Sequence, residues 1–317
     1  MRVAVTGAGG FIGHHLVTYL KQQGHWVRGV DLKEPEFTEI DADEFRLLDL
    51  RSETSAVEAT KDVDHVYALA ADMGGMGFIS SHHAQILRNN ALINLNTIEA
   101  ARVNGVSRYL YSSSACVYPD YLQVDAEVTP LKEQDAYPAA PQDAYGWEKL
   151  VSEILAEYYR SDYALETRIV RFHNVYGPYG TFEGGREKVP AALCRKVAAA
   201  DDGGTIEVWG DGEQTRSFCH VDDCVEGIHR IMNSDHAAPI NLGTDRMVTI
   251  NELAEMVIRI SGKTLAIEHV DGPQGVRGRN SDNTILRETL GWEPEISLEE
   301  GLVGTYRWIE KQVAARL

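Results

Sequence analysis

Apolar residues in the first half of the chain occur in short runs, and longer segments with helical spacing separate these runs. The short runs predict strands near Arg2–Thr6, Trp26–Asp31, Phe45–Leu48, His65–Ala70, Arg108–Ser112 and Thr167–Phe172. The segments between them predict helices, notably Phe11–Gln23, His82–Asn104 and Asp143–Ser161. Strands that alternate with helices are typical of βαβ units, whose strands run parallel. The order therefore predicts an α/β fold built on a doubly wound parallel sheet.

Beyond Gly177 the pattern becomes mixed and richer in glycine and proline. It predicts helices near Val189–Ala200, Val221–Asn233, Ile250–Ile260 and Leu298–Ala314. We therefore expect residues 1–176 to form the domain that holds the sheet, and residues 177–317 to form mainly a smaller mixed α/β lobe that faces the substrate. Part of the second half, about residues 205–243, is expected to return to the first domain. A chain of 317 residues is long enough for this division.

The chain is acidic overall. It carries 30 basic and 48 acidic side chains, which give a formal net charge of −18, while 44% of its residues are hydrophobic and 25% are charged. These proportions exclude disorder or a coiled coil as the main state. The acidity argues against nucleic acid and anionic membranes as partners. An anionic ligand would consequently need a local basic pocket.

The sequence also indicates a cytoplasmic protein without disulfides or a metal. No stretch approaches the roughly 20 apolar residues that span a bilayer, and the first residues reach glycines too early for the core of a signal peptide. The histidines and cysteines show no metal-ligand spacing. The cysteines contain no CxxC pair and fit no disulfide framework; they are Cys116, Cys194, Cys219 and Cys224.

A glycine-rich turn follows the first predicted strand and leads into a helix. Gly7, Gly10 and Gly13 have the spacing G-x-x-G-x-x-G, with Phe11 and Ile12 inside the turn. The first glycine permits a tight turn, the second lets the backbone approach a pyrophosphate, and the third lets helix and sheet pack closely. The free N–H groups at the start of the helix then face the phosphates. This combination predicts a Rossmann site for a dinucleotide, which these five residues contact.

Acidic residues end the second and third predicted strands. Asp31 follows Gly13 by 18 residues, which places its carboxylate to accept a hydrogen bond from a ribose 2′-hydroxyl. Because a carboxylate there repels a 2′-phosphate, we expect NAD rather than NADP, although Lys33 nearby weakens that preference. Asp49 is expected either to accept a hydrogen bond from the adenine amino group or to be a solvated strand end.

Tyr145 and Lys149 stand four residues apart, on one face of a predicted helix. A free tyrosine has a pKa of about 10 and is a poor base at neutral pH. The Lys149 ammonium and a positive nicotinamide ring would both favour the phenolate, which then accepts a hydroxyl proton. Ser114, at the end of the fifth predicted strand, can share the same hydroxyl. For an isolated pair, a surface tyrosine beside a solvated lysine is the alternative.

These features together resemble the extended short-chain dehydrogenase/reductases, many of which act on nucleotide sugars. In the 4,6-dehydratases of that group the segment after the fifth strand resembles T-D-E-V-Y-G, and in simple 4-epimerases it resembles S-A-T-V-Y-G. This chain has S-A-C-V-Y-P at residues 114–119. The acid pair that eliminates water is therefore missing, and a thiol takes its place.

Further segments resemble the GDP-mannose 3,5-epimerase family more specifically. They are A-A-D-M-G-G-M-G-F at residues 70–78, R-F-H-N-V-Y-G-P at 171–178, G-G-R-E-K at 184–188, W-G-D-G-E-Q-T-R-S-F at 209–218 and G-V-R-G-R-N-S-D at 275–282. With the glycine-rich turn they extend over nearly the whole chain. The first and third of these strings and the S-S-A-C segment are the most specific, whereas the turn and the Tyr-Lys pair occur throughout the wider group.

This resemblance implies an isomerase that acts on GDP-mannose with bound NAD. In that family C4 of the hexose is oxidised transiently, protons on C3 and C5 are exchanged, and C4 is reduced again, with GDP-L-galactose and GDP-L-gulose as products. By resemblance Tyr145 removes the C4 hydroxyl proton, with help from Lys149 and Ser114. Cys116 and Lys188 match the family's acid–base pair, although on the sequence alone Lys188 would be a solvated loop lysine.

The resemblance also implies the residues that hold the sugar nucleotide. Gly74 lets the backbone approach the sugar, and Asn174 binds sugar or diphosphate, with a turn-capping asparagine as the alternative. The implied substrate-binding set is Gly74, Ser114, Ala115, Cys116, Asn174, Glu187, Lys188, Val189, Lys196, Gln214, Thr215, Arg216 and Arg279.

The basic members of this set would form the pocket that the net charge demands. Lys196, Arg216 and Arg279 match positions that hold diphosphate, nucleotide or sugar, and the planar guanidinium suits diphosphate oxygens. Arg186 and Arg277 lie nearby in the sequence but are more typical of structural ion pairs.

Two other functions were weighed against this one. A 4-epimerase or 4,6-dehydratase for another nucleotide sugar is disfavoured by Ala115 and Cys116. A non-catalytic Rossmann protein that senses NAD would often lack part of the tyrosine–lysine pair, which this chain retains. Because members of the family commonly pair helices in a four-helix bundle, we expect a homodimer formed by helices His82–Asn104 and Asp143–Ser161.

Overall fold

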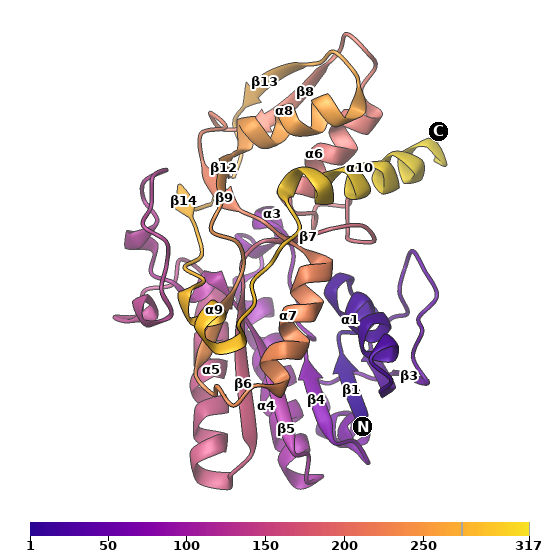
Figure 1. Ribbon diagram of the computed structural model, residues 1–317, viewed down its shortest axis with the longest axis vertical. Helices are drawn as coiled ribbons and strands as arrows, with labels where there is room; N and C mark the ends of the chain where they lie inside the picture. Colours follow the sequence, from indigo (N-terminus) through magenta and orange to yellow (C-terminus); the bar gives the residue numbers. More distant parts are fainter. Residues whose placement is uncertain (274, 317) are drawn as a thin grey trace.

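The computed structural model describes residues 1–273 and 275–316. Within these residues a seven-stranded parallel sheet has the order β11-β6-β5-β4-β1-β2-β3 (Figure 1). The strands are β1 (Arg2–Thr6), β2 (Trp26–Asp31), β3 (Glu44–Leu47), β4 (His65–Ala68), β5 (Arg108–Ser114), β6 (Glu166–Phe172) and β11 (Pro239–Leu242). The strand order reverses at β1, as it does in doubly wound sheets. The predicted α/β fold is therefore confirmed.

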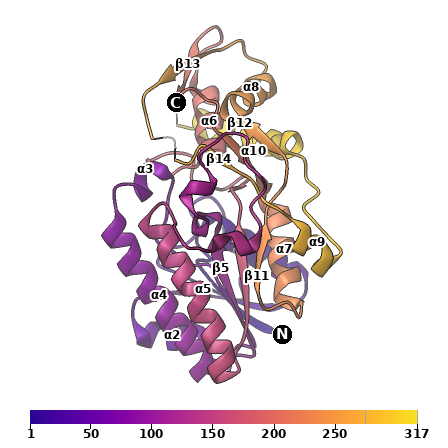
Figure 2. The same cartoon turned by 90° about the vertical axis from the view of Figure 1, so that its left-hand side faces the viewer.

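Helices cover both faces of the sheet, because each helix buries an apolar side against it. On one face lie α1 (Phe11–Gln22) and α7 (Val221–Asn233); on the other lie α2 (Glu53–Thr60), α4 (His83–Val103) and α5 (Ala144–Tyr163) (Figures 1 and 2). Leu16 and Leu20 of α1 are fully buried in the first core, and Ile98 and Ala156 anchor α4 and α5 in the opposite one. The three long helices predicted in the first half match α1, α4 and α5 to within two residues at each end.

The sequence pattern does not predict the seventh strand, β11. This strand has only four residues, and it reaches the sheet after a long excursion rather than through a regular strand–helix alternation. Ile240 and Leu242 are fully buried where β11 pairs in parallel with β6. The segment that returns to the sheet, α7 with β11, is shorter than the expected residues 205–243. β8 (Thr205–Trp209) and β9 (Thr215–Ser217) pair with strands of the other lobe instead.

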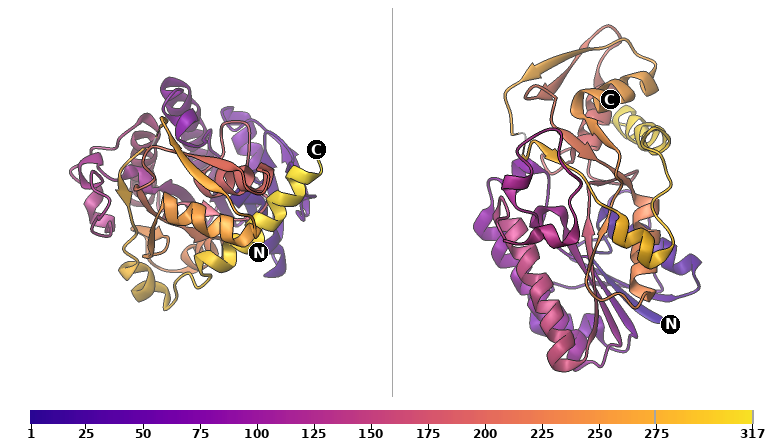
Figure 3. Two further views of the ribbon diagram at one scale, coloured as in Figure 1. Left: turned by 90° about the horizontal axis from the view of Figure 1, so that it is seen from above. Right: turned by 60° about the vertical axis from the view of Figure 1, so that its left-hand side comes forward.

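A smaller upper lobe covers the carboxyl ends of the strands (Figure 3). α6 (Val189–Ala199), α8 (Ile250–Ser261) and α10 (Leu298–Ala314) pack together around a second core, which explains the apolar spacing predicted for them. β13 (Ala266–Val270) pairs with β8, while β12 (Met247–Thr249) and β14 (Gly278–Arg279) flank β9. Capping boxes begin two of the helices: Thr249 with Glu252 at α8, and Ser297 with Glu300 at α10.

Short elements connect the two parts. They are α3 (Met76–Ile79), the 3-10 turns η1 (Ala115–Val117), η2 (Asp120–Leu122) and η3 (Glu133–Ala136), the pair β7 (Val175–Tyr176) and β10 (Cys219–His220), and α9 (Thr284–Leu290). Most of them stand above the sheet, so the loops that carry the predicted site converge there.

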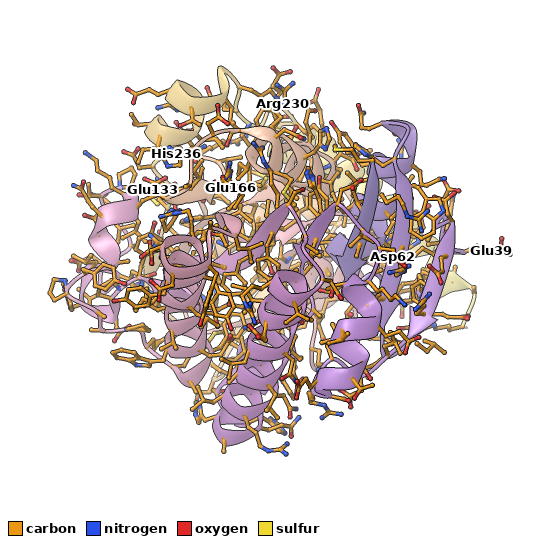
Figure 4. All side chains as sticks on the ribbon, turned by 90° about the horizontal axis from the view of Figure 1, so that it is seen from below. Glu39, Asp62, Glu133, Glu166, Arg230 and His236 are labelled. Carbon is orange, nitrogen blue, oxygen red and sulfur yellow. The ribbon has the colours of Figure 1, made fainter. Side chains whose placement is uncertain are left out.

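The two ends of the sheet differ in character. Figure 4 looks at the amino ends, where Asp62 precedes β4 and Glu166 begins β6. The carboxyl ends lie on the far side, beneath the upper lobe, where ligands of doubly wound sheets bind. None of the helices among the described residues is sufficiently long and apolar to cross a membrane.

Candidate active site

The glycine-rich loop between β1 and α1 packs closely on the neighbouring backbone. Gly7 has a φ of +72°, and a Cβ atom there would lie 2.9 Å from the backbone nitrogen of Ala70. A Cβ atom on Gly13 would lie 2.0 Å from the carbonyl oxygen of Gly7, so helix and loop approach too closely for any side chain. Within the described chain, no side chain caps α1, which begins after Gly10. Its first N–H groups, those of Phe11 and Ile12 included, therefore suit a pyrophosphate.

A cavity opens beside this helix end, between the glycine-rich loop and the segment after β2. Its lining comprises Gly9, Gly10, Phe11, His14, Lys33, Pro35, Glu36, Phe37, Thr38, Tyr179 and Thr181. Three of these residues belong to the loop itself, so the cavity is continuous with the predicted dinucleotide site.

Asp31 stands at the end of β2 beside the same loop. Its Oδ2 accepts a hydrogen bond from the Gly9 nitrogen at 3.0 Å, and its Oδ1 accepts one from the Leu32 nitrogen at 2.6 Å. Burial raises the pKa of Asp31, while these hydrogen bonds and the charge of Lys33 oppose the rise. The backbone contacts hold the carboxylate where the sequence predicts a ribose contact.

Asp49 follows β3, and its carboxylate pairs with Arg51 of the same loop. Its Oδ1 accepts from Arg51 Nε at 2.9 Å and its Oδ2 from a terminal nitrogen of Arg51 at 2.7 Å. Hydrogen bonding from Arg51 lowers the pKa of Asp49. The structure therefore describes a paired, partly solvated strand end, and the contact of Asp49 with adenine stays a prediction.

Tyr145, Lys149 and Ser114 meet where β5 ends. Tyr145 and Lys149 lie on successive turns of α5, with Lys149 Nζ 5.5 Å from the centroid of the Tyr145 ring. The same Nζ donates to the carbonyl oxygen of Ser112 at 2.8 Å, which holds the lysine against β5. Ser114 forms a hydrogen bond with the Tyr145 side chain. The three residues predicted to handle the hydroxyl proton are thus brought together.

Burial dominates the electrostatics of Tyr145. Burial raises the pKa of Tyr145 well above 10.0, the charges of Cys116 and Glu148 add to the rise, and the Ser114 hydrogen bond opposes it. Burial also lowers the pKa of Lys149 itself. The lysine alone therefore does not produce a phenolate, because desolvation of the charged phenol outweighs its attraction. A second positive group close to the phenol is needed.

Cys116 lies in η1, two residues beyond Ser114, and is half-buried. A terminal nitrogen of Arg279 donates to its Sγ at 3.4 Å, while Arg279 Nε donates to Gln123 Oε1 at 2.5 Å. Arg279, which the resemblance places in substrate binding, therefore also contacts the predicted acid–base thiol. No sequence pattern indicated Gln123, because this residue lies in an irregular segment that carries no periodic signal.

Lys188 approaches the same region from the upper lobe. It immediately precedes α6, and solvent reaches its side chain. The surrounding protein nevertheless lowers the pKa of Lys188 by desolvation, Cys116 and Cys224 oppose the shift, and the charge of Arg279 adds to it. Lys188 therefore lies within electrostatic range of Cys116, and the use of the two as an acid–base pair stays a prediction.

Arg216 and Arg279 form a basic centre within the acidic molecule. Arg216 of β9 donates to the carbonyl oxygens of Thr215 at 2.7 Å and Val276 at 2.5 Å, so its side chain is tied to the segment that precedes β14. Burial and repulsion by Arg279 lower the pKa of Arg216 to about 9. Two cations that repel each other at close range suit an anion such as a diphosphate.

Several predicted binding residues hold the backbone of this region. Asn174 has a φ of +44° and donates through Nδ2 to the Ser217 carbonyl at 2.9 Å, as a turn-capping asparagine does. Lys196 Nζ donates to the Glu207 carbonyl at 2.7 Å. Gln214 and Thr215 likewise donate to the carbonyls of Trp209 and Ala126. Their contacts with a substrate stay predictions.

The remaining predicted residues line the meeting of the two lobes. Ala115 is buried beside Cys116, and Gly74 lies against Phe78. Glu187 accepts a hydrogen bond from the Gly185 nitrogen at 2.7 Å, and Val189 begins α6. The approach of this backbone to the sugar, which is expected for Gly74, stays a prediction.

A buried polar network supports the site from below, and the sequence analysis missed it. Glu153 of α5 pairs with Arg171 of β6 at 2.6 Å and accepts a short hydrogen bond from the Ser113 hydroxyl. Arg171 also donates to the Tyr118 hydroxyl at 3.2 Å. Two signals pointed to it: an arginine inside an apolar strand, and Glu153 four residues after Lys149 on the inward face of the helix.

Comparison with known proteins agrees with this geometry. The sequence model of the NAD dependent epimerase/dehydratase family matches residues 3–243. The chain belongs to this family. It is 53% identical to GDP-mannose 3,5-epimerase of Arabidopsis thaliana over 99% of its own length and 83% of that protein. It is 52% identical to GDP-mannose 3,5-epimerase 1 of Oryza sativa subsp. indica, again over 99% of the chain and 82% of the relative.

Solved structures of the same family superpose on nearly the whole chain. UDP-glucose 4-epimerase from Thermotoga maritima, solved with UDP-glucose, is 28% identical with a TM-score of 0.87, covering 99% of this chain and all of that one. UDP-glucose 4-epimerase from Thermus thermophilus, solved with NAD, is 26% identical with a TM-score of 0.85 over 98% of this chain and 99% of that one.

Membership in the NAD-dependent epimerase/dehydratase family makes NAD the cofactor. The cofactor fits the residues present, because Gly7 and Gly13 leave no room for a side chain, no side chain caps the first N–H groups of α1, and the Asp31 carboxylate lies beside the loop at Gly9. These N–H groups would hold the phosphates, and Asp31 would accept a hydrogen bond from a ribose hydroxyl. Among residues 1–273 and 275–316, no group of three or more His, Cys, Asp or Glu side chains is placed to hold a metal ion.

Proposed function

We propose that this protein epimerises GDP-mannose at C3 and C5, with GDP-L-galactose as the double product and GDP-L-gulose as the single one. The relatives that bear this activity in their names are 53% and 52% identical over 99% of the chain. The observation that carries the proposal is the position of Cys116, which packs on the cluster that contains Tyr145, accepts a hydrogen bond from Arg279 and lies within electrostatic range of Lys188. A 4-epimerase needs the tyrosine alone, whereas inversion at two further carbons needs an additional acid and base.

Tyr145 would accept the proton of the sugar C4 hydroxyl, and Ser114 would orient that hydroxyl. Bound NAD supplies the hydride acceptor at C4 and returns the hydride at the end, so the reaction has no net redox change. Lys149, fixed by the Ser112 carbonyl, would stabilise the phenolate together with the positive charge of the cofactor. The upward pKa shift of Tyr145 in the chain alone makes proton transfer dependent on that added charge.

The ketone at C4 acidifies the protons on both neighbouring carbons, C3 and C5. Inverting either centre requires removal of a proton from one face of the ring and delivery of a proton to the other. Cys116 belongs to η1 of the sheet domain and Lys188 to the upper lobe, so we propose that they act on opposite faces of the sugar ring. The lowered pKa of Lys188 raises its neutral fraction near physiological pH, so it can serve as a base as well as an acid.

Arg216 and Arg279 would bind the diphosphate, since their mutual repulsion is relieved by an anion. Lys196, Gln214 and Thr215 would contribute to the nucleotide end of the site, and Asn174 would contact sugar or diphosphate. The other members of the substrate-binding set proposed on the resemblance, Gly74, Ala115, Glu187 and Val189, would line the sugar.

We also propose a homodimer in which α4 and α5 of two subunits form a four-helix bundle. These helices lie side by side on the outer face of the sheet (Figure 2) and expose several large apolar side chains there. The exposed residues are Leu87, Leu95 and Val103 of α4 and Trp147, Val151, Tyr158 and Tyr163 of α5. Such a concentration of exposed apolar surface favours a protein interface. Analytical ultracentrifugation at micromolar concentration tests this, and a monomer of the wild type rejects it.

The activity is tested by proton NMR of GDP-mannose with the purified protein in deuterated water, without added cofactor. The expected result is loss of the C3 and C5 proton signals while C4 keeps its hydrogen. The Cys116→Ala variant should retain NAD and the fold but lose proton exchange at C3 and C5. Exchange at neither carbon, with NAD added, rejects GDP-mannose as substrate; full exchange by Cys116→Ala rejects the thiol as an acid–base group.

A further inference from the structure

An ion pair joins the two lobes next to Lys188. A terminal nitrogen of Arg186 lies 3.2 Å from Asp72 Oδ1, although the two residues are 114 positions apart in the sequence. Asp72 follows β4 in the sheet domain, whereas Arg186 stands two residues before Lys188 in the upper lobe. The contact is therefore placed to control how the lysine approaches the rest of the site.

The carboxylate of Asp72 is fixed by α4 independently of Arg186. Its Oδ2 accepts hydrogen bonds from Gln85 Nε2 and Asn89 Nδ2, each at 2.9 Å. Its backbone nitrogen donates to Asn90 Oδ1 at 2.6 Å. Burial raises the pKa of Asp72, but the hydrogen bonds from these amides and from Arg186 outweigh burial and lower it overall. An ionised, immobile anchor results.

Arg186 makes three further contacts with the loop that follows Asp72. The same terminal nitrogen donates to the Met73 carbonyl at 3.2 Å, and the guanidinium carbon lies 3.7 Å from the centroid of the Phe78 ring. The Arg186 carbonyl accepts from the Gly75 nitrogen at 3.0 Å. A Cβ atom on Gly75 would lie 2.4 Å from the Glu187 carbonyl oxygen, so the two backbones meet as closely as glycine allows. Figure 2 shows α3 of this loop at the boundary of the two lobes.

Phe78 connects these contacts with the catalytic groups. It belongs to a small buried cluster with Ile79, Ile86 and Tyr145, against which Cys116 packs. The Phe78 ring thus contacts the guanidinium of Arg186 and also belongs to the cluster that contains Tyr145 and packs against Cys116. Because Arg186 stands two residues before Lys188, a shift of Arg186 would displace Lys188 relative to Cys116.

We propose that Arg186 is a positioning residue, which sets Lys188 opposite Cys116 by holding Asp72 and Phe78 of the other lobe. The inference deepens the proposed function: proton exchange at C3 and C5 depends on Arg186, whereas NAD binding and hydride transfer at C4 do not. Because the Arg186 side chain is 46% exposed, its ion pair contributes little to folding stability. If Arg186 had a purely structural role, its replacement would therefore leave the activity nearly unchanged.

The test compares Arg186→Met with a matched control, Arg246→Met. The side chain of Arg246 is 49% exposed, close to the 46% of Arg186, and it forms an ion pair with Glu299 of α10. In Arg186→Met we expect exchange at C3 and C5 to slow by about 10- to 100-fold, as misplacement of a reacting group does. NAD content and the transient absorbance of the reduced cofactor should stay within about twofold, and the melting temperature within about 2 °C. The control should exchange both protons like the wild type.

Two further variants refine the interpretation. Arg186→Lys keeps a positive charge but loses the planar stacking on Phe78, so it should recover only part of the exchange rate. Asp72→Asn keeps the shape of the anchor but removes its charge, so it should slow exchange at C3 and C5 without slowing hydride transfer. Equal slowing of hydride transfer and proton exchange in these variants would overturn the positioning role.

A second measurement needs no substrate. Backbone hydrogen–deuterium exchange should rise in Arg186→Met at residues 73–79 and 184–189 together, and should not rise in Arg246→Met. If backbone hydrogen–deuterium exchange at these two segments is the same in Arg186→Met as in the wild type, the proposal is overturned, whatever the enzyme assays give. If the wild type failed to exchange protons of GDP-mannose, the proposed function would fall, while this measurement would still decide whether Arg186 holds the two loops together.

Discussion

Arg171 and Glu153 form an ion pair whose charged groups are 2.6 Å apart and whose side chains are only 2% and 3% exposed. Arg171 extends from β6 and Glu153 from α5, so the pair joins this strand to the helix that carries Tyr145. The Ser113 hydroxyl donates to the same carboxylate, and the neighbouring Ser112 carbonyl receives Lys149. The ion pair consequently holds the end of β5 and the Tyr145 helix in one rigid unit.

Glu153→Gln should destabilise the protein strongly, because it leaves the Arg171 charge buried without a counterion. The expected loss is about 3–5 kcal/mol of unfolding free energy. Urea denaturation followed by circular dichroism measures it. Glu226→Gln, which removes an exposed pair with Arg230 on α7, is the control and should cost no more than about 0.5 kcal/mol. Similar midpoints for the two variants would contradict the structural role of the buried pair.

The elements of this fold that carry regular spacing were predictable. The helix expected over Val221–Asn233 is α7 with the same bounds, because its apolar residues repeat along one face and His220 caps its start. β11 was not predictable, because a strand of four residues is too short to show a periodic pattern. Its burial also depends on pairing with β6, whose partner residues lie 70 positions earlier in the chain. Pairing between distant segments leaves no local pattern.

The candidate site was predictable where a motif names the residue, and not where folding decides its surroundings. Tyr145, Lys149 and Ser114 meet as expected, yet the pKa of Tyr145 shifts upward because its burial is a property of the folded chain. The contact of Arg279 with Cys116 joins residues 163 positions apart. The resemblance identified both residues, but nothing in the sequence indicated that they touch.

His173 makes stability depend on acidic pH. Burial lowers the pKa of this fully buried histidine from 6.5 to about 3, and the charges of Arg279 and Arg171 add to the shift, while a hydrogen bond with Asn241 opposes it. Below pH 6.5 the unfolded chain therefore takes up a proton that the folded chain does not. Stability falls as the pH drops from about 6.5 toward 3, by roughly 2 kcal/mol from this group at pH 5.

His173→Gln should remove that contribution, although His14 and His65, whose pKa values burial lowers to about 4, keep part of the acid sensitivity. The measurement is the free energy of unfolding at pH 7.5 and pH 5. The difference between the two values should be smaller in the variant than in the wild type. His83→Gln, at an exposed position at the start of α4, should leave the difference unchanged. If the wild type and the two variants lost the same free energy of unfolding between pH 7.5 and pH 5, the assignment to His173 would be contradicted.

Asp31→Asn tests the cofactor site. The carboxylate accepts backbone hydrogen bonds from Gly9, Leu32 and Lys33 and faces the predicted ribose. Removing the charge should weaken NAD binding by about 10-fold, which is the effect of losing a hydrogen bond to a charged group. It should also reduce the preference of the protein for NAD over NADP. Titration of cofactor-stripped protein with both nucleotides measures the two affinities. Glu34→Gln, an exposed carboxylate in the same loop, should leave them unaltered.

Lys188 should react as an unusually acidic ammonium. Desolvation lowers its pKa below 10.5, and the positive charge of Arg279 contributes in the same direction. Arg279→Gln removes that charge, so the pKa of Lys188 should rise and its neutral fraction at a given pH should fall. The rate at which an amine-selective reagent modifies Lys188, followed against pH by mass spectrometry of its peptide, reports the change. Lys311, near the end of α10, serves as an internal reference in the same sample. An unchanged Lys188 profile would show that Arg279 does not act on the lysine, and its role would then lie with Cys116 and the substrate.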